Sequence, residues 1–314
     1  MTKRALVFPG QGSQAVGMGK ALAEAFAAAR EVYQEIDEAL KQSLSKLMWT
    51  GPEDQLTLTE NAQPAIMAAS LAAMRVLERE ARFDLAKHAA YVAGHSLGEY
   101  SALTAAGAFS VGEAAKLLKA RGRAMQRAVP VGQGAMAALL GAELDQAQEV
   151  SQEAAKSQVC AVANDNAPGQ VVISGDKAAI ERAVEIAKSK GIKRAMMLNV
   201  AAPFHCPLMA PAAREMEDVL GSATIAPPRL PVLANVTAKP VSDPETIRKL
   251  LVQQITGVVR WRETVLSLPS LGVDTMVEVG AGKVLTPMAK RTPVELTLVN
   301  VDAPAEVESF IKTL

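Results

Sequence analysis

The sequence predicts an α/β protein with a mostly parallel sheet and a smaller inserted domain. Short apolar runs, such as Ala5 to Phe8 and Ala89 to Ala93, alternate with longer Ala-rich segments of helical composition. This alternation is typical of a parallel sheet whose two faces are covered by helices. Further along the chain the predicted order becomes β-α-β-β-α-β, which is the ferredoxin-like order. We therefore expect a large domain formed by residues 1–127 and 201–314, and a small domain formed by residues 128–200.

The boundaries of the individual elements follow from turn residues and apolar periodicity. In the first third of the chain we expect helices at residues 20–44, 64–81 and 97–106, with Gly51-Pro52 interrupting the pattern. Pro64 is expected in the first turn of its helix, where proline is tolerated. The expected elements of the small domain are strands at 134–140, 158–163, 170–175 and 195–200, and helices at 145–156 and 176–190. A late strand is expected at 276–279.

Composition and charge exclude several classes of function. The 314 residues carry 33 basic and 33 acidic side chains, so the balanced charge argues against a general electrostatic grip on nucleic acid. Two cysteines make no disulfide framework and favour a reducing compartment. The first apolar run is too short for a signal peptide, and no uncharged stretch approaches the length of a membrane span. We expect a cytoplasmic protein, a monomer, with no nucleic-acid or membrane partner.

The segment Gly94-His95-Ser96-Leu97-Gly98 is the first candidate for chemistry. The pattern Gly-x-Ser-x-Gly alone is weak, because chance supplies roughly one match in ten chains of this length. Here it follows an apolar run and precedes a helical segment, which is the strand–turn–helix context of a nucleophile elbow. The start of that helix would offer amide donors to a developing oxyanion. We therefore predict Ser96 as an acyl-transfer nucleophile rather than part of a glycine-rich turn.

A serine nucleophile needs a base, and the chain has three histidines. His95 adjoins Ser96, so its side chain should point elsewhere, and His88 is expected at the surface before its strand. His205, held between two prolines in Pro203-Phe204-His205-Cys206-Pro207, is left as the base by elimination. Cys206 is the rival nucleophile, but it neighbours His205 in sequence and is better interpreted as a buried small residue.

The loop Gly10-Gln11-Gly12-Ser13-Gln14-Ala15 admits two interpretations. It fits the dinucleotide pattern G-x-G-x-x-G/A after a strand. However, a long helical segment follows with no clear second strand, so we favour a loop that presents an amide or the Gln11 side chain to an acyl oxyanion. The histidines and cysteines show no metal-ligand spacing, and we expect no metal site.

Several segments, in this order, resemble the malonyl-CoA:acyl carrier protein transacylases of fatty acid synthesis and the related acyltransferase domains of polyketide synthases. They are Phe8 to Gln14, Gln63 to Ala65, Gly94 to Tyr100, Arg121 to Met125, Gly169 to Gly175, Pro203 to His205 and Glu278 to Gly280. The resemblance spans nearly the whole chain. It implies an α/β-hydrolase-like large domain with a ferredoxin-like small one, and malonyl transfer from malonyl-CoA to the phosphopantetheine thiol of acyl carrier protein by a ping-pong route. It implies no cofactor.

The resemblance also assigns roles to individual residues. Ser96 would carry the malonyl ester and His205 would move its proton, while the Leu97 amide and Gln11 would form the oxyanion hole. Arg121 matches the arginine that binds the malonyl carboxylate, a pairing that suits the planar guanidinium. Without the resemblance, Arg121 would be interpreted as a solvated arginine among other basic residues of its helix. The remaining substrate-site candidates are Gln254, Asn166 and Phe204.

One feature of serine hydrolases is the acid that stands between the serine and the histidine in chain order. Asp165 and Asp176 lie in that interval here, but both belong to the predicted small domain. The resemblance implies a neutral partner for His205 instead. We hypothesise that a less polarised histidine slows attack by water on the acyl-enzyme. Three alternatives stay open: a free-standing polyketide synthase acyltransferase, a serine thioesterase, and a nucleotide-binding module built on Gly10 to Gly12.

Overall fold

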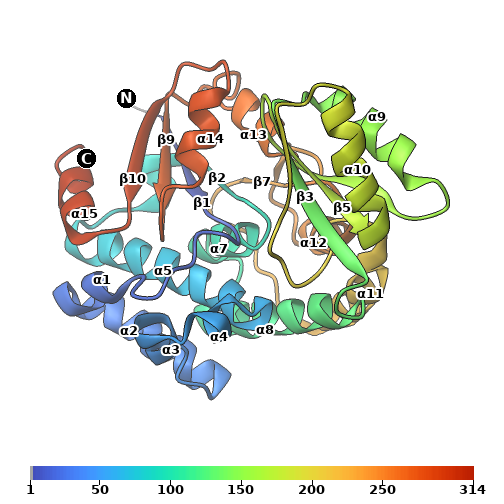
Figure 1. Cartoon of the computed structure of the whole chain (residues 1–314). Coiled ribbons are helices and arrows are strands. Elements are labelled where there is room, and N and C mark those ends of the chain that lie inside the picture. Colours follow the sequence, from blue (N-terminus) through green and yellow to red (C-terminus); the bar gives the residue numbers. More distant parts are fainter. Residues whose placement is uncertain (1–2) are drawn as a thin grey trace.

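The computed structural model describes residues 3–314, which form two sheets side by side (Figure 1). The larger sheet has the strand order β10-β9-β1-β2-β7-β8 and is parallel except for the β7–β8 pair. Its strands are β1 (Arg4–Phe8), β2 (Ala89–Gly94), β7 (Val232–Leu233), β8 (Pro240–Val241), β9 (Thr275–Val279) and β10 (Thr297–Val301).

Helices cover both faces of this sheet. Because the central strand β1 is buried on both sides, its sequence is continuously apolar. In β1, Leu6 and Phe8 pack into one hydrophobic cluster and Ala5 and Val7 into another. The helices before the small sheet are α1 (Lys20–Ala25), α2 (Ala27–Leu40), α3 (Leu44–Thr50), α4 (Glu53–Thr57), α5 (Thr59–Glu80), α6 (Leu85–His88), α7 (Gly98–Ala105) and α8 (Val111–Arg127). Those after it are α11 (Ala210–Ser222), α12 (Pro244–Thr256), α13 (Trp261–Ser267), α14 (Leu285–Arg291) and α15 (Pro304–Ile311), with a 3₁₀ turn at Pro207–Met209.

The smaller sheet is antiparallel with the order β4-β5-β3-β6, which confirms the ferredoxin-like prediction. Its elements are β3 (Gly134–Leu140), α9 (Leu144–Ala155), β4 (Cys160–Ala167), β5 (Gln170–Asp176), α10 (Lys177–Ser189) and β6 (Arg194–Met197). Along β3, Ala137 and Leu139 pack under α9 and α10, whereas Met136 and Ala138 face a cavity on the other side. This alternation is the two-residue period of a strand with two different faces.

We propose residues 128–200 as the small domain and residues 1–127 with 201–314 as the large one. All four strands and both helices of the smaller sheet fall between 134 and 197, which supports these limits. The two parts are tied together where Val259 exchanges backbone hydrogen bonds with Ala163 and Asp165 of β4. The small sheet is therefore fixed against the large domain beside α13.

Two of the expected helix limits are wrong. The segment 20–44 is divided, because Phe26 is extended (φ −126°, ψ 127°) and Lys41 takes a left-handed conformation (φ 50°). Packing against neighbouring elements therefore overrides the helix propensity of the alanines. Helix α5 begins at Thr59, so Pro64 lies inside the helix rather than in its first turn. The remaining helices and strands that were predicted are found, with ends that differ by a few residues.

Candidate active site

Ser96 lies at the sharp turn between β2 and α7, where its φ is 53°. A non-glycine residue in this left-handed region is held there by its surroundings. The flanking glycines make the turn possible: a Cβ on Gly94 would lie 1.9 Å from the carbonyl carbon of Gly98, and one on Gly98 would lie 2.2 Å from the carbonyl oxygen of Phe8. The elbow geometry predicted from the sequence is therefore present, and it lifts the Ser96 hydroxyl above the end of the sheet.

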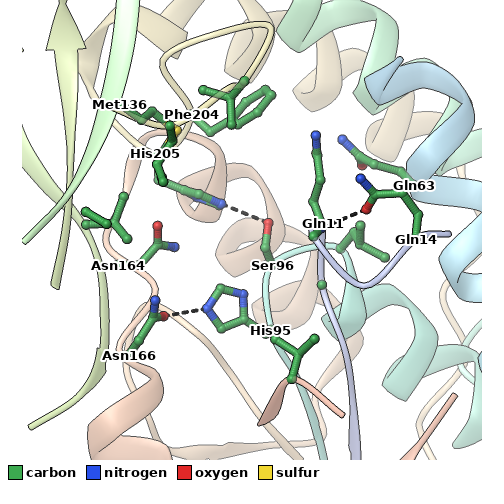
Figure 2. A pocket seen from close by; sticks show the side chains of 18 of the residues that line it. Gln11, Gln14, Gln63, His95, Ser96, Met136, Asn164, Asn166, Phe204 and His205 are labelled. Atoms are coloured by element: carbon green, nitrogen blue, oxygen red, sulfur yellow. Dashed lines mark hydrogen bonds between the residues drawn. The ribbon is translucent and has the colours of Figure 1, made fainter. Parts of the chain in front are cut away.

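His205 reaches Ser96 from the segment after the small sheet, and the two side chains meet in Figure 2. The distance from Ser96 Oγ to His205 Nε2 is 2.8 Å, and His205 Nδ1 is 2.8 Å from the carbonyl oxygen of Gln254. Because a carbonyl can only accept, Nδ1 carries the proton and Nε2 of the neutral ring is the acceptor. The arrangement leaves the Ser96 hydroxyl to donate to a free imidazole nitrogen, which is the geometry of a general base.

The surroundings keep His205 neutral. Burial lowers the pKa of His205 from 6.5 to about 3, and the nearby Arg121 guanidinium adds to the decrease. Its side chain is 4% exposed. A pKa of about 3 keeps the ring unprotonated throughout the physiological range, so it is free to accept a proton. It also makes the imidazole a weaker base than usual and the imidazolium that forms a stronger acid.

Arg121 is buried in α8 and points its guanidinium at the Ser96 hydroxyl, which contradicts the alternative of a solvated arginine on a helix face. Nη2 donates to Ser96 Oγ (3.1 Å) and to Gln254 Oε1 (2.8 Å), and Nη1 donates to Gln63 Oε1 (2.7 Å). Helix α8 comes this close to α5 because residue 122 is glycine: a Cβ there would lie 2.5 Å from the Cα of Glu60. The result is a fixed positive charge beside Ser96.

Gln11 and Leu97 lie beside the same cavity as Ser96. Both residues line the cavity, and neither amide donates a hydrogen bond within residues 3–314. Gln11 belongs to the loop after β1, and a Cβ on Gly10 of that loop would lie 2.6 Å from the carbonyl oxygen of His95. The glycine-rich loop is thus pressed against the elbow, with residues 9–19 separating β1 from the next helix. That spacing differs from the immediate strand-to-helix turn of a dinucleotide site.

The cavity above Ser96 has a volume of about 380 Å³ and lies between the two sheets. Phe204 and Asn166, both expected at the site, line it. Asn166 Oδ1 is 2.8 Å from His95 Nε2, and Figure 2 shows this pair beside Ser96. His95 therefore directs its ring to Asn166, as its position next to Ser96 suggested, while still forming part of the wall. His88 stacks on Phe83 and does not line the cavity.

Gln254 is fully buried below Ser96 and is not part of the cavity wall. Its carbonyl orients His205, and its side chain connects several other groups: Nε2 donates to the Ser96 carbonyl (3.0 Å), to Glu99 Oε2 (2.8 Å) and to Asn235 Oδ1 (3.2 Å). The structure therefore brings Gln254 to the site as a support for Ser96 and His205 rather than as a lining residue.

The acids of the small domain bind elsewhere. Asp165 accepts a hydrogen bond from Arg262 (3.0 Å), and Asp176 accepts one from the Val159 amide (2.7 Å). Cys206 is buried, and burial raises the pKa of its thiol, so it is the buried small residue that the sequence suggested. Within residues 3–314, no three His, Cys, Asp or Glu side chains gather closely enough to hold a metal ion.

Sequence reasoning missed four polar residues around Ser96. Gln63 and Asn164 line the cavity, whereas Asn235 and Glu99 lie beneath the elbow. Asn235 stands just after β7, and polar residues that follow the strands of a parallel sheet meet at its carboxyl edge, a signal that could have revealed it.

The family model described as "Acyl transferase domain" matches residues 5–307. The chain belongs to this family. It is 42% identical over 315 residues to the malonyl CoA-acyl carrier protein transacylase of Bacillus subtilis (strain 168), covering 100% of this chain and 98% of that protein. Solved structures of similar proteins share the fold of this chain. The acyl-carrier-protein-S-malonyltransferase of Bartonella henselae has a TM-score of 0.97 and 50% identity, with 99% of each chain covered.

A second solved structure shows a relative with its partner. A malonyl-transacylase in complex with a type II polyketide synthase acyl-carrier protein has a TM-score of 0.96 and 40% identity, with 100% of each chain covered. None of the helices in the described part of the chain combines the length and the apolar character that crossing a membrane requires.

Proposed function

We propose that this protein transfers the malonyl group of malonyl-CoA to the phosphopantetheine thiol of an acyl carrier protein and so supplies fatty acid synthesis. The observation that carries the proposal is the 2.8 Å contact between Ser96 Oγ and the neutral His205 Nε2, with the Arg121 guanidinium 3.1 Å from the same oxygen. A nucleophile, a base and a fixed cation converge on one point. The full-length similarity to malonyl transacylases supports the same substrate.

The first half-reaction forms an ester on Ser96. The hydroxyl gives its proton to His205 Nε2 while Oγ attacks the thioester carbonyl of malonyl-CoA, and the amides of Leu97 and Gln11 stabilise the oxyanion. When the tetrahedral intermediate collapses, the carbon–sulfur bond breaks and the CoA sulfur leaves with the proton of His205. In the second half-reaction the carrier thiol gives its proton to His205 and attacks the ester, and Ser96 leaves with that proton. Substrates and side chains supply every proton and bond in this scheme, so we propose that no cofactor takes part.

Arg121 selects the malonyl group in this scheme. A guanidinium has five N–H donors. Arg121 makes three side-chain hydrogen bonds, one from Nη1 and two from Nη2. A carboxylate that takes the Nη2 contact now made to Ser96 Oγ, together with the remaining Nη1 donor, would be held by two parallel hydrogen bonds. Such binding also releases the Ser96 oxygen from the guanidinium, which favours its attack.

Phe204 and Asn166 complete the substrate site. Phe204 stands in the cavity wall directly before the catalytic base, where its ring would crowd an α-methyl group on the substrate. One methyl group discriminates by only about 1–3 kcal/mol, so we propose a preference for malonyl over methylmalonyl groups. Asn166 shapes the opposite wall by holding the His95 ring.

The neutral partner of His205 supports transfer rather than hydrolysis. The ring is oriented by a peptide carbonyl, and the two acids considered from the sequence bind other groups. We propose that this weaker polarisation leaves the malonyl ester long-lived towards water until a thiol arrives. If Asp165→Asn and Asp176→Asn each lost most transfer activity with the fold intact, this explanation would be wrong.

Labelling with radioactive malonyl-CoA, followed by acid quenching and peptide mapping, tests the proposal. We expect label on the peptide that contains Ser96, release of one CoA per ester, and no label in Ser96→Ala. Label on any other residue sinks the mechanism. Adding a carrier protein or water alone to the labelled enzyme then separates a transacylase from a thioesterase.

The choice of carrier decides between the two acyltransferase roles. A relative was solved with a polyketide synthase carrier, so transfer rates to a fatty acid carrier and to a polyketide carrier should be compared directly. We expect the fatty acid carrier to be preferred. We place the enzyme in the cytoplasm, where malonyl-CoA and carrier proteins meet.

A further inference from the structure

Glu99 is a buried carboxylate that the proposed mechanism does not use. It is the only charged residue between Lys87 and Glu113 in the sequence, and it is 2% exposed in the first turn of α7. Buried acids are rare unless they are paired or fully hydrogen-bonded. No ion pair joins Glu99 directly to Arg121 or to any other residue among those described. Its position beneath the elbow therefore calls for an explanation.

Both partners of Glu99 grip the backbone of Ser96. Glu99 Oε2 accepts hydrogen bonds from the backbone N–H of Asn235 (3.0 Å) and from Gln254 Nε2 (2.8 Å). Asn235 Oδ1 in turn accepts the Ser96 N–H (2.8 Å), and Gln254 Nε2 donates to the Ser96 carbonyl (3.0 Å). Asn235 also donates from Nδ2 to the Gly94 carbonyl (2.7 Å). One carboxylate thus anchors the backbone of Asn235 and the side chain of Gln254, and the side chains of these two residues hold both peptide groups of the nucleophile.

The elbow needs such an anchor because its conformation is strained. Ser96 has a φ of 53°, and a non-glycine residue keeps such a conformation only where the surrounding contacts over-determine it. Without the contacts from Asn235 and Gln254, the backbone would relax towards an ordinary region and carry the hydroxyl away from His205.

The same carboxylate fixes which way the Gln254 amide faces. Gln254 Oε1 accepts from Arg121 Nη2 (2.8 Å), whereas Nε2 donates to Glu99. A cation on the oxygen side and an anion on the nitrogen side both favour this orientation. Gln254 also supplies the carbonyl that orients His205, so its placement affects the base as well as the nucleophile.

We propose that Glu99 is a positioning residue for acyl transfer: through Asn235 and Gln254 its carboxylate holds Ser96 in the elbow and keeps His205 aligned with it. This rests on the proposed role of Ser96 as the nucleophile. A purely structural role predicts something different. Burial raises the pKa of Glu99 to about 7, so the charged form opposes folding and a neutral isostere should serve the fold at least as well.

The test compares Glu99→Gln and Glu99→Asp with the wild-type full chain, using a fluorophosphonate probe that has neither a carboxylate nor CoA. Because a misplacement of about 1 Å can reduce a rate by up to about 100-fold, we expect Glu99→Gln to slow Ser96 labelling by about ten-fold or more. kcat should fall by a similar factor with malonyl-CoA and with acetyl-CoA, while KM stays near the wild-type value. Glu99→Asp keeps the charge but is one methylene shorter, and its rate should lie between the other two.

Glu278→Gln is the matched control. Glu278 is also fully buried, but it accepts hydrogen bonds from the Val284, Leu285 and Thr286 amides at the start of α14 and from Asn300. Removing this carboxylate should lower the melting temperature and leave the labelling rate of the folded enzyme unchanged. A slow Glu99→Gln beside a normal Glu278→Gln separates positioning from a general loss of buried acids.

Two results would overturn the proposal. Labelling of Ser96 at the wild-type rate in folded Glu99→Gln would do so, as would a change confined to KM for malonyl-CoA, which would make Glu99 only a counter-charge for Arg121. If Glu99→Gln does not fold, labelling of Glu99→Asp at the wild-type rate overturns the proposal equally. The proposed function fails separately: wild-type enzyme that reacts with the fluorophosphonate at Ser96 but takes no malonyl group from malonyl-CoA would refute the function and leave the Glu99 comparison valid.

Discussion

Replacing Glu99 by glutamine should change how the stability of the enzyme depends on pH. Burial raises the pKa of Glu99 from 4.5 to about 7 in the folded protein. Between these values the folded state holds a proton that the unfolded chain has released, so the free energy of unfolding decreases as the pH rises. The wild-type carboxylate therefore opposes folding fully above about pH 7 and not at all when protonated in both states.

The size of this effect follows from the same two pKa values. Their difference, 7 minus 4.5 or about 2.5, corresponds to ~3 kcal/mol of unfolding free energy at high pH. About 2 kcal/mol of it develops between about pH 5.5 and about pH 8. Glutamine cannot ionise, so the stability of Glu99→Gln relative to wild type should rise by this amount across that interval.

Urea unfolding of both proteins at a series of pH values measures the difference. Other shifted groups, such as His205 and Asp165, are present in both proteins and cancel in the comparison. Two stability curves that run parallel from about pH 5.5 to about pH 8 would refute the reasoning, because they would mean that Glu99 titrates alike in the folded and unfolded chains.

Three further outcomes are expected. Arg121→Ala should lower kcat/KM for malonyl-CoA by about 30-fold or more, since truncating a buried charged partner costs ~2–5 kcal/mol. It should lower kcat/KM for acetyl-CoA less, and an unchanged preference for malonyl-CoA would remove Arg121 from substrate recognition. Gly98→Ala places a Cβ 2.2 Å from the Phe8 carbonyl oxygen, so fluorophosphonate labelling of Ser96 should be lost, and normal labelling would contradict this close approach. Because the pKa of His205 is lowered to about 3, its ring should stay neutral from about pH 8 down to about pH 5, and an NMR titration of its imidazole within that range would contradict the assignment.

The fold was largely predictable because its signals are local. The apolar runs that became β1, β2 and β5 are bounded by glycine or proline, and the order of elements in the small domain identifies its topology. The interruption at Phe26 has no such local signal, since the surrounding alanines favour a helix and only packing against other elements decides where the chain turns.

The meeting of Ser96 and His205 in the candidate site was predictable, but the residues that support them were not. Ser96 follows from its flanking glycines, and His205 from the small number of histidines. The contact between Asn235 and Ser96 joins residues 139 positions apart, and no periodicity reveals such a pair. Glu99 is the one supporting residue with a visible sequence signal, because it is a single charged residue within a long uncharged stretch. A charged residue in a segment that is expected to be buried can indicate a hydrogen-bonded group near a functional site.

The acceptor that orients His205 belongs to the main chain, and this limits what mutation can remove. The Gln254 carbonyl lies in the last turn of α12, where helix carbonyls lack partners within the helix. Any amino acid at position 254 supplies the same carbonyl oxygen. Gln254→Ala would therefore remove the side-chain hydrogen bonds but keep the carbonyl that accepts from His205 Nδ1. Substitution at position 254 therefore changes only the side-chain contacts of this residue. A mutational scan would measure the importance of the Gln254 side chain, but it would not detect the role of the Gln254 carbonyl in orienting His205.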